Sequence, residues 1–221
     1  MGDRPQALVL RTAGTNCDAE LCAAFELAGA DVKMVHVDRL AEDPTPIERA
    51  AIIGLPGGFS HGDDIAAGRV FAVKLREHLG NALRAAAERG ALMIGPCNGF
   101  QVMVQAGLLP SVGGEQELAL AENAGGRFID RWSRVEADAD SVCLWTKPFV
   151  EGEYSQEALV LPVAHGEGRV VPRNGQVIER LASNGQIAFR YAEEVNGSVD
   201  HIAGICDPTG RIFGLMPHPE R

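Results

Sequence analysis

The first candidate for chemistry is a cysteine held between two glycines. Cys97 lies in the run GPCNG, between an apolar segment at 91–95 and a helix-like segment at 98–106. Small residues around a nucleophile at a strand-to-helix turn let neighbouring backbone approach, so the side chain points out of the sheet. The helix N-terminus favours the thiolate, and the backbone N–H of Asn98 can donate to an oxyanion. The spacing leaves a second interpretation open, namely a small buried cysteine at a tight turn.

The other four cysteines carry weaker signals. Cys17 precedes a predicted helix, where a lowered thiol pKa would make it a second nucleophile candidate, but it lacks the bracketing glycines. Cys22 belongs to the apolar stripe of that helix, and Cys143 and Cys206 lie in strand-like segments, so we expect these three to be structural. Five cysteines without a CxxC pair argue against a disulfide framework or a zinc site.

A thiol nucleophile needs a base within hydrogen-bond reach and a third group that orients the base. Two histidines have a carboxylate two residues later, His218 with Glu220 and His165 with Glu167. Side chains at i and i+2 of an extended segment point to the same side, so either carboxylate can hold one imidazole nitrogen. The flanking prolines restrain His218, which we therefore prefer as the base, and His61 is a third candidate. The remaining histidines are expected to be structural or solvated: His36, His78 and His201.

Alternating strands and helices are expected to position these residues. In the first half, strand-like segments at 7–11, 31–37, 51–55 and 91–95 alternate with helix-like segments at 18–28, 66–79, 82–89 and 98–106. Near-continuous apolar strands joined by helices predict a mostly parallel sheet with helices on both faces. Further strand-like segments at 128–135, 159–164, 187–191, 202–206 and 212–216 are separated by turn residues, among them Asn174-Gly175. They predict an antiparallel extension of the sheet in a single α/β domain, 1–221, with a surface loop at 113–126.

Composition excludes several functions. The chain has 221 residues, with 20 Lys and Arg against 30 Asp and Glu, so its net charge of -10 disfavours nucleic-acid binding. No apolar run reaches the roughly 20 residues of a membrane span, and the N-terminus lacks a signal peptide's apolar region, so we expect a cytoplasmic protein. The acidic pairs Asp63-Asp64 and Glu193-Glu194 suit a solvated face better than a metal site. A GxxxxGK[ST] phosphate loop is absent, so no ATP site is expected in this chain.

The sequence resembles the class I (triad) glutamine amidotransferases, which have a flavodoxin-like fold. More narrowly, it is similar to the glutaminase subunits of phosphoribosylformylglycinamidine synthases, which serve purine biosynthesis. The matching segments follow the expected order along the whole chain: GTNCDAE at 14–20, PGGFSHGDDIAAGR at 56–69, CNGFQ at 97–101, PVAHGEG at 162–168, NGS at 196–198 and GLMPHPER at 214–221.

The resemblance implies a role for each site residue. Cys97 would attack the side-chain amide of glutamine and form a thioester with loss of ammonia. His218 would take the thiol proton and later activate water, and Glu220 would orient His218. Backbone N–H groups would form the oxyanion hole, those of Gly58 and Asn98. Gln101 would help to bind the substrate. The HGEG motif that contains His165 recurs in the family, and its role in substrate binding or subunit contact is left open.

The resemblance also implies partners. Ammonia would pass to a separate synthetase subunit that converts formylglycinamide ribonucleotide to its amidine, and a small third subunit often completes such assemblies. ATP and Mg²⁺ would bind only the synthetase. The sequence departs from the family at Pro96, where an aliphatic residue is usual, at His61, where tyrosine is usual, and at Glu194-Val195, where Asn-Pro is usual. Relatives commonly continue into a closing helix, whereas this sequence ends at Arg221, so a terminal carboxylate is expected near the triad.

Two alternatives concern function. The first is a catalytically silent regulatory or assembly subunit that keeps Cys97, His218 and Glu220 but cannot align them, because of Pro96 or the short C-terminus. The second is another cysteine hydrolase, such as a peptidase or an esterase, because the turn around Cys97 does not name the substrate. Gln101 and the PGGF turn argue against the second alternative.

Overall fold

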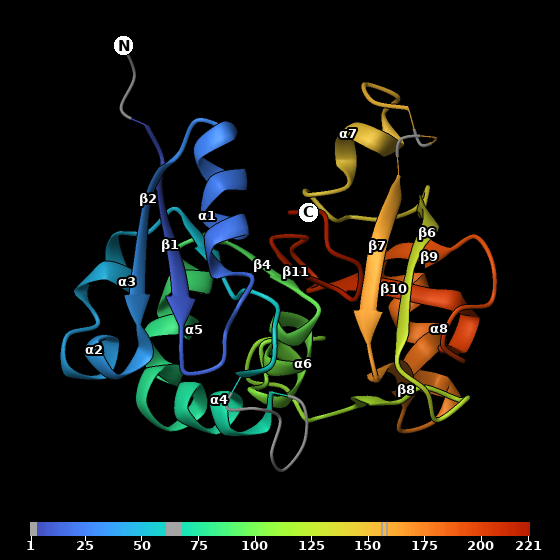
Figure 1. Cartoon of the computed structure of the whole chain (residues 1–221), viewed down its shortest axis with the longest axis horizontal. Helices are drawn as coiled ribbons and strands as arrows, with labels where there is room; N and C mark the ends of the chain where they lie inside the picture. Colours follow the sequence, from blue (N-terminus) through green and yellow to red (C-terminus); the bar gives the residue numbers. More distant parts are fainter. Residues whose placement is uncertain (1–3, 61–67, 156, 158) are drawn as a thin grey trace.

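The central sheet has a parallel half and an antiparallel half (Figure 1). The computed structural model describes residues 4–60, 68–155, 157 and 159–221. Within these residues the main sheet has nine strands in the order β2-β1-β3-β4-β11-β10-β9-β6-β7. Neighbours from β2 to β11 are parallel, and neighbours from β11 to β7 are antiparallel. The predicted mostly parallel sheet with an antiparallel extension is therefore confirmed.

The strands divide between the two halves in a simple way. The parallel half contains β2 (Asp31–His36), β1 (Gln6–Arg11), β3 (Ile52–Gly54), β4 (Leu92–Pro96) and β11 (Ile212–Leu215). The antiparallel half contains β10 (Ile202–Cys206), β9 (Ile187–Tyr191), β6 (Ile129–Ala137) and β7 (Val160–His165). Two further strands form a small antiparallel sheet, β5 (Leu118–Glu122) and β8 (Glu167–Pro172).

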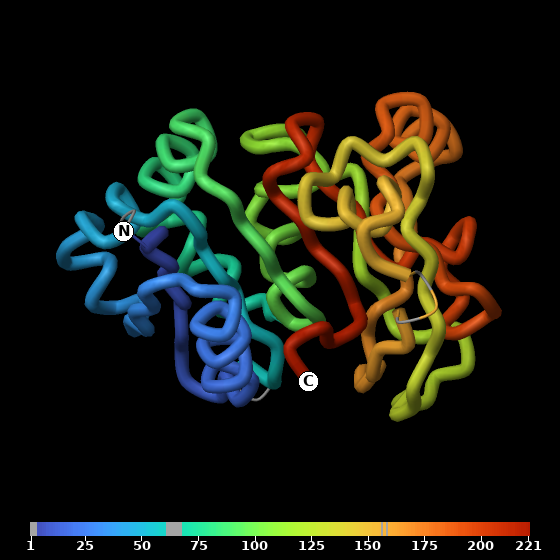
Figure 2. Tube along the Cα trace, turned by 90° about the horizontal axis from the view of Figure 1, so that it is seen from above, coloured from blue at the N-terminus to red at the C-terminus, as the bar shows by residue number. Residues whose placement is uncertain are grey.

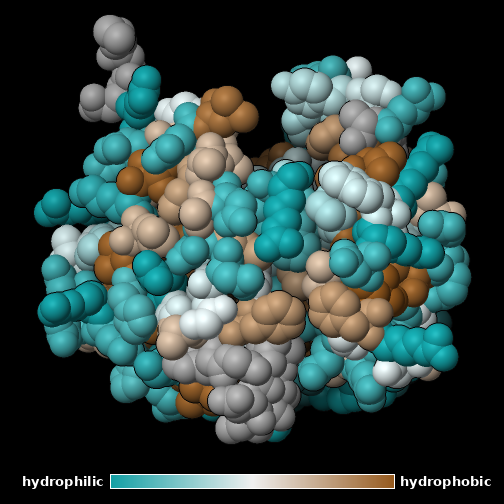
Figure 3. Space-filling model, in the orientation of Figure 1, coloured by the Kyte–Doolittle hydropathy of each residue, from teal (hydrophilic) through white to brown (hydrophobic). Residues whose placement is uncertain are grey.

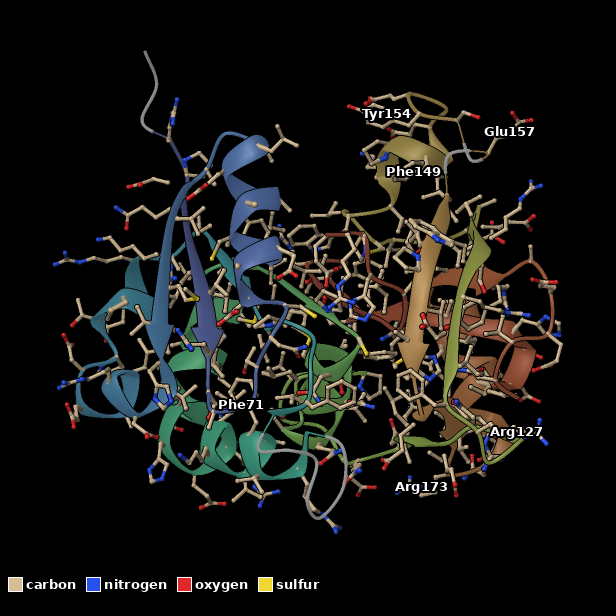
Figure 4. All side chains as sticks on the ribbon, in the orientation of Figure 1. Phe71, Arg127, Phe149, Tyr154, Glu157 and Arg173 are labelled. Carbon is tan, nitrogen blue, oxygen red and sulfur yellow. The ribbon has the colours of Figure 1, made fainter. Side chains whose placement is uncertain are left out.

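Helices cover both faces of the sheet, as predicted. On one face α1 (Asp18–Leu27) packs Leu21 and Phe25 into the cluster that contains Ala7 and Val9 of β1. On the opposite face a larger apolar cluster includes Leu8 and Leu10, and Phe71 within it is fully buried (Figure 4). The helices that contribute to this second cluster are α2 (Val37–Glu42), α3 (Thr45–Arg49), α4 (Arg69–Lys74), α5 (Gly80–Glu88), α6 (Asn98–Gln105) and α8 (Gly175–Ser183).

Several elements differ from the expectation. The expected loop at 113–126 contains β5, because the buried Leu118 is part of the larger core and the strand pairs with β8. The helices expected at 66–79 and 82–89 join through a π-helical turn, Leu75–Leu79, into one helical run from residue 69 to residue 88. Residues 66 and 67 lie outside the described part of the chain. The short α2 and α3 were not predicted.

One predicted turn is the start of a helix, and one predicted strand is absent. Asn174, taken as part of a turn, is the N-cap of α8, and its side chain accepts a hydrogen bond from Val177 N at 3.3 Å. Asparagine favours both turns and N-caps, so the residue type alone does not separate them. Cys143 lies in an irregular segment rather than a strand, and a turn at 144–146 leads from it into the short α7 (Lys147–Val150).

The surface on one side of the molecule is mixed in character. Hydrophilic residues alternate with small hydrophobic areas, and a hollow lies between the part that carries α1 and the part that carries α7 (Figure 3). Among the described residues, the helices are too short and too polar to cross a membrane.

A close approach between α6 and the end of β3 predicts a stability effect. A Cβ added at Gly99 would overlap the carbonyl oxygen of Leu55. Because both groups belong to the buried core, we expect Gly99→Ala to lower the free energy of unfolding by about 3 kcal/mol or more. The matched control is Gly175→Ala, where an added Cβ meets no atom within 4 Å. We expect the control to change stability by no more than about 1 kcal/mol in urea denaturation. Equal losses in both variants would contradict this account.

Candidate active site

The backbone at Cys97 is strained. Cys97 is the only residue between β4 and α6, and it adopts φ 49° and ψ -107°. A positive φ is rare for a residue with a side chain and recurs at functional sites, where the surroundings enforce it. Here the Cys97 N–H donates to Leu215 O at 2.7 Å, which fixes the turn to the neighbouring strand. The predicted sharp turn at Cys97 is confirmed.

The glycines around Cys97 are sterically required. A Cβ on Gly95 would lie 2.7 Å from the carbonyl carbon of Gly99, and a Cβ on Gly99 would overlap the backbone of Leu55. Pro96 occupies the last position of β4, opposite Leu215. Proline has no N–H to donate to a neighbouring strand, and at a strand end this loss disturbs the sheet least. The sheet therefore accommodates Pro96 where the family usually has an aliphatic residue.

The predicted base and its orienting carboxylate are paired. His218 Nδ1 lies 2.7 Å from Glu220 Oε1, and only 3% and 1% of the two side chains are exposed. The His218 backbone N–H donates to Pro162 O at 2.9 Å, so the segment after β11 is anchored to β7. Figure 2 shows this C-terminal segment between the two halves of the fold. The pairing leaves the Nε2 atom of His218 for a thiol proton.

Cys97 and His218 line one cavity of about 300 Å³, at the low end of the size range of small-molecule sites. The cavity lies where the ends of β4 and β7 meet, and the Cys97 thiol donates to Ala164 O at 3.7 Å. Phe59 and Phe128, both about half exposed, stack at its rim with ring centroids 6.4 Å apart. The lining residues that the sequence had not indicated are Asn16, Phe59, Phe128, Ala164, Gly166 and Arg221.

Of the two residues predicted to supply oxyanion donors, Gly58 lines the same cavity as Cys97, and Asn98 directly follows Cys97. Their role as donors stays a prediction. Gly58 lines the cavity with φ 121°, and a Cβ there would overlap the side chain of Asn16, so only glycine fits. The Gly58 turn is held against the segment before α1, because Cys17 N donates to Gly57 O at 3.3 Å. Asn98 is the first residue of α6, where backbone N–H groups have no partner within the helix.

Gln101 lines the cavity, and its amide also links two parts of the protein. Its Nε2 donates to Glu167 O at 2.6 Å, and its Oε1 accepts from Asn98 Nδ2 at 2.9 Å. The side chain therefore ties α6 to the first residue of β8. Contact between Gln101 and a substrate stays a prediction.

The pKa of the Cys17 thiol differs from the one expected from the sequence. It caps α1 and lines the same cavity, but burial raises its thiol pKa to about 11, and the lowered pKa expected at a helix start is wrong. The guanidinium of Arg221 donates to its sulfur at 2.9 Å. Desolvation outweighs the helix N-terminus and the arginine, so Cys17 is a protonated thiol at neutral pH and a poor nucleophile.

One group of described residues has the composition of a metal site. Potential ligand atoms of Cys17, His218 and Glu220 lie within 4.8 Å of one another. His218 and Glu220 already bind each other, and the Arg221 cation contacts the sulfur. A metal ion would have to displace Arg221 and break the pair, so this geometry suits proton transfer better than metal binding.

The other acidic and histidine candidates fall outside the cavity or outside the described residues. Glu193 is exposed and pairs with Arg131 at 3.3 Å, as a solvated face should. His61 and the pair Asp63-Asp64 lie outside the described residues.

His165 enters the site in a way that its sequence spacing did not indicate. It lines the cavity with 3% of its surface exposed, and neither ring nitrogen has a hydrogen-bond partner among the described residues. Burial, and secondarily the nearby His218, lowers its pKa to about 4. His165 is therefore a neutral imidazole at physiological pH.

Comparison with known proteins identifies the class. Residues 4–221 match the family described as the CobB/CobQ-like glutamine amidotransferase domain. The chain belongs to this family and has the class I glutamine amidotransferase fold.

Its similar relatives carry a more specific name. The chain is 42% identical over 224 residues to phosphoribosylformylglycinamidine synthase subunit PurQ of Dehalococcoides mccartyi, covering 98% of this chain and 85% of the relative. The same subunit of Methanococcus maripaludis is 40% identical over 232 residues, covering 98% and 82%. Among solved structures, PurLQS from Thermotoga maritima aligns with a TM-score of 0.78 at 34% identity, covering 99% and 89%.

The shifted pKa of His165 predicts acid sensitivity. The folded value of about 4 lies below 6.5, the usual value, so the unfolded chain binds this proton more tightly. The stabilisation is complete above about pH 6.5 and is lost as the pH falls towards 4, by up to about 3 kcal/mol. We expect the loss of unfolding free energy between pH 7.5 and pH 4.5 to be smaller in His165→Gln than in wild type, measured by urea denaturation.

The control for this experiment is His78→Gln, because His78 is exposed on the π-helical turn. This variant should keep the wild-type pH dependence. An unchanged pH dependence in His165→Gln would show that His165 is not the group responsible.

Proposed function

We propose that this chain is the glutaminase subunit of a phosphoribosylformylglycinamidine synthase. It hydrolyses L-glutamine to glutamate and ammonia through a thioester on Cys97. The observation that carries the proposal is a strained cysteine that shares a cavity with a buried His218–Glu220 pair. The relatives named PurQ, similar over nearly the whole chain, support the assignment to this synthase.

The reaction begins with proton transfer. His218 Nε2 takes the proton from the Cys97 thiol while Glu220 holds Nδ1 and stabilises the imidazolium. The thiolate attacks the amide carbon of glutamine, and the carbonyl oxygen becomes an oxyanion. The backbone N–H groups of Gly58 and Asn98 stabilise that charge.

The intermediate then loses ammonia and is hydrolysed. The imidazolium of His218 gives its proton to the leaving amine, the C–N bond breaks, and the γ-glutamyl thioester on Cys97 remains. A water molecule then attacks the thioester as His218 accepts its proton. The C–S bond breaks, the Cys97 thiol regains a proton, and glutamate leaves.

The ammonia serves a partner. A synthetase subunit uses it to convert formylglycinamide ribonucleotide to formylglycinamidine ribonucleotide, and a small third subunit completes the assembly. ATP and Mg²⁺ bind the synthetase rather than this chain. A similarity to the PurLQS structure of Thermotoga maritima supports the partnership.

A silent subunit on the same fold is disfavoured by geometry. That alternative required Pro96 or the C-terminus to prevent alignment of the triad. Pro96 ends β4 without disturbing the turn at Cys97, and His218 and Glu220 are within 2.7 Å of each other. The position of Pro96 and the pairing of His218 with Glu220 therefore support an active site over a silent one.

The nucleophile is tested by Cys97→Ala. We expect glutamate and ammonia release, measured with the synthetase subunit present, to fall by about 10³-fold or more, because no other group can form the thioester. Cys17→Ala is the matched control, since burial keeps that thiol protonated. Glutamine hydrolysis that persists in Cys97→Ala would contradict the proposal.

The orienting carboxylate is tested by Glu220→Gln. The amide keeps the size of Glu220 but cannot stabilise the imidazolium of His218, so we expect kcat to fall by about 10²- to 10⁴-fold with a small change in KM. The control Glu151→Gln removes an exposed carboxylate that pairs only with Lys147 at 3.3 Å. A kcat within about twofold of wild type in Glu220→Gln would rule out an orienting role for this carboxylate.

A further inference from the structure

The junction of β7 and β8 is held by hydrogen bonds to its backbone carbonyl groups. The carbonyl groups of all four residues of this HGEG segment, 165–168, accept hydrogen bonds from amide groups. Asn123 supplies two of them, from Nδ2 to His165 O at 2.8 Å and from its backbone N to Gly166 O at 2.9 Å. Gln101 Nε2 donates to Glu167 O at 2.6 Å, and Asn196 Nδ2 donates to Gly168 O at 3.0 Å. The backbone is fixed before any ligand binds.

The imidazole ring of His165 is fixed but unsatisfied. It packs so closely on Gly168 that a Cβ there would overlap the ring. His165 is buried and lines the cavity, yet neither ring nitrogen has a hydrogen-bond partner among the described residues. A buried polar group without a partner is costly unless a ligand or water satisfies it. Because the ring is neutral at physiological pH, one nitrogen accepts and the other donates.

Glu167 adds a negative charge to the same wall. It lines this cavity and also a second one that Arg76 borders. It is partly buried, and among the described residues its carboxylate forms no ion pair or hydrogen bond. The hydrogen bond from Gln101 to its carbonyl ties it to α6, the helix that begins directly after Cys97. The wall formed by His165 and Glu167 therefore keeps a fixed position relative to the nucleophile.

These two side chains offer acceptors that suit a cation. When the glutamine amide lies at Cys97, the α-ammonium at the opposite end of the molecule still needs partners. The one cationic side chain of the described lining, Arg221, contacts the sulfur of Cys17. A carboxylate and a neutral imidazole nitrogen match an ammonium group in charge and in hydrogen-bond capacity.

We propose that the side chains of Glu167 and His165 bind the α-ammonium group of glutamine and select for amino-acid amides over simple amides. The inference rests on the proposed function, because it takes the amide carbon to react at Cys97. Glu167 supplies the charge, and the His165 ring supplies a hydrogen-bond acceptor that is already desolvated. Both are substrate-binding residues and take no part in the proton transfers.

The test compares two electrophiles that carry the same reactive diazoketone group. The probe 6-diazo-5-oxo-L-norleucine carries the α-ammonium group, whereas 6-diazo-5-oxohexanoate lacks it and is otherwise the same. The rate of Cys97 labelling by each reagent is measured by peptide mass spectrometry on the full chain with its synthetase subunit. The variants are Glu167→Gln and His165→Phe, and Glu122→Gln is the control, because Glu122 lies on the strand paired with β8 and does not line the cavity.

Wild type and Glu122→Gln should label faster with the amino-acid probe. In Glu167→Gln and His165→Phe we expect this preference to fall by about tenfold or more, with labelling by the second probe unchanged. If His165→Phe does not fold, Glu167→Gln alone decides. A full preference in Glu167→Gln, or an equal loss with both probes, would overturn the inference and leave the proposed function standing. Absence of Cys97 labelling in wild type with either probe would overturn the proposed function, and the inference with it.

Discussion

The site depends on how closely three backbone segments approach one another at Cys97. The turn from β4 into α6 needs a positive φ at a residue with a side chain, and such a conformation survives only where surrounding contacts enforce it. The contacts are backbone to backbone: Gly99 lies against the carbonyl of Leu55, and Cys97 N donates to Leu215 O. Neighbouring strands on both sides of β4 therefore hold the turn. The thiol is placed by the whole parallel half of the sheet rather than by its own loop.

The antiparallel half supplies the opposite wall of the site. The end of β7 provides the carbonyl of Ala164 to the Cys97 thiol and the carbonyl of Pro162 to the backbone of His218. Cys97 and His218 are thus both hydrogen-bonded to β7, and both adjoin β11, which bonds to the turn at Cys97 and leads into His218. Because β11 and β10 join the two halves within one hydrogen-bonded sheet, the separation of nucleophile and base is set by strand register. A loop alone could not hold it as firmly.

Local signals in the sequence were sufficient for part of this arrangement. The glycines around Cys97 indicate a sharp turn, because the turn itself leaves no room for side chains there. The i, i+2 spacing of His218 and Glu220 indicates a pair, because both residues lie in one extended segment. Apolar strand patterns likewise revealed the parallel half, because its inner strands β1, β3, β4 and β11 are largely buried, whereas β2 at the edge is more exposed. The pattern did not reveal β5, whose burial depends on its distant partner β8.

Properties set by distant packing could not be obtained from the sequence. A helix start predicts a lowered thiol pKa for Cys17, but burial, and to a lesser extent the negative charge of the distant Glu220, raises it. His165 and Glu167 have the same i, i+2 spacing as His218 and Glu220, so the sequence alone does not distinguish the two pairs. Only the fold shows that the first pair faces the cavity separately, while the second pair is hydrogen-bonded and buried.

The two imidazoles of the cavity gain different protonation behaviour from their partners. In the proposed mechanism His218 becomes a cation, and the buried carboxylate of Glu220 compensates that charge. His165 has no such carboxylate partner among the described residues, so burial keeps it neutral. If both rings were charged, their repulsion in a poorly solvated cavity would raise the free energy of the imidazolium that the reaction requires. A neutral His165 can therefore contact the substrate while His218 alone carries the proton.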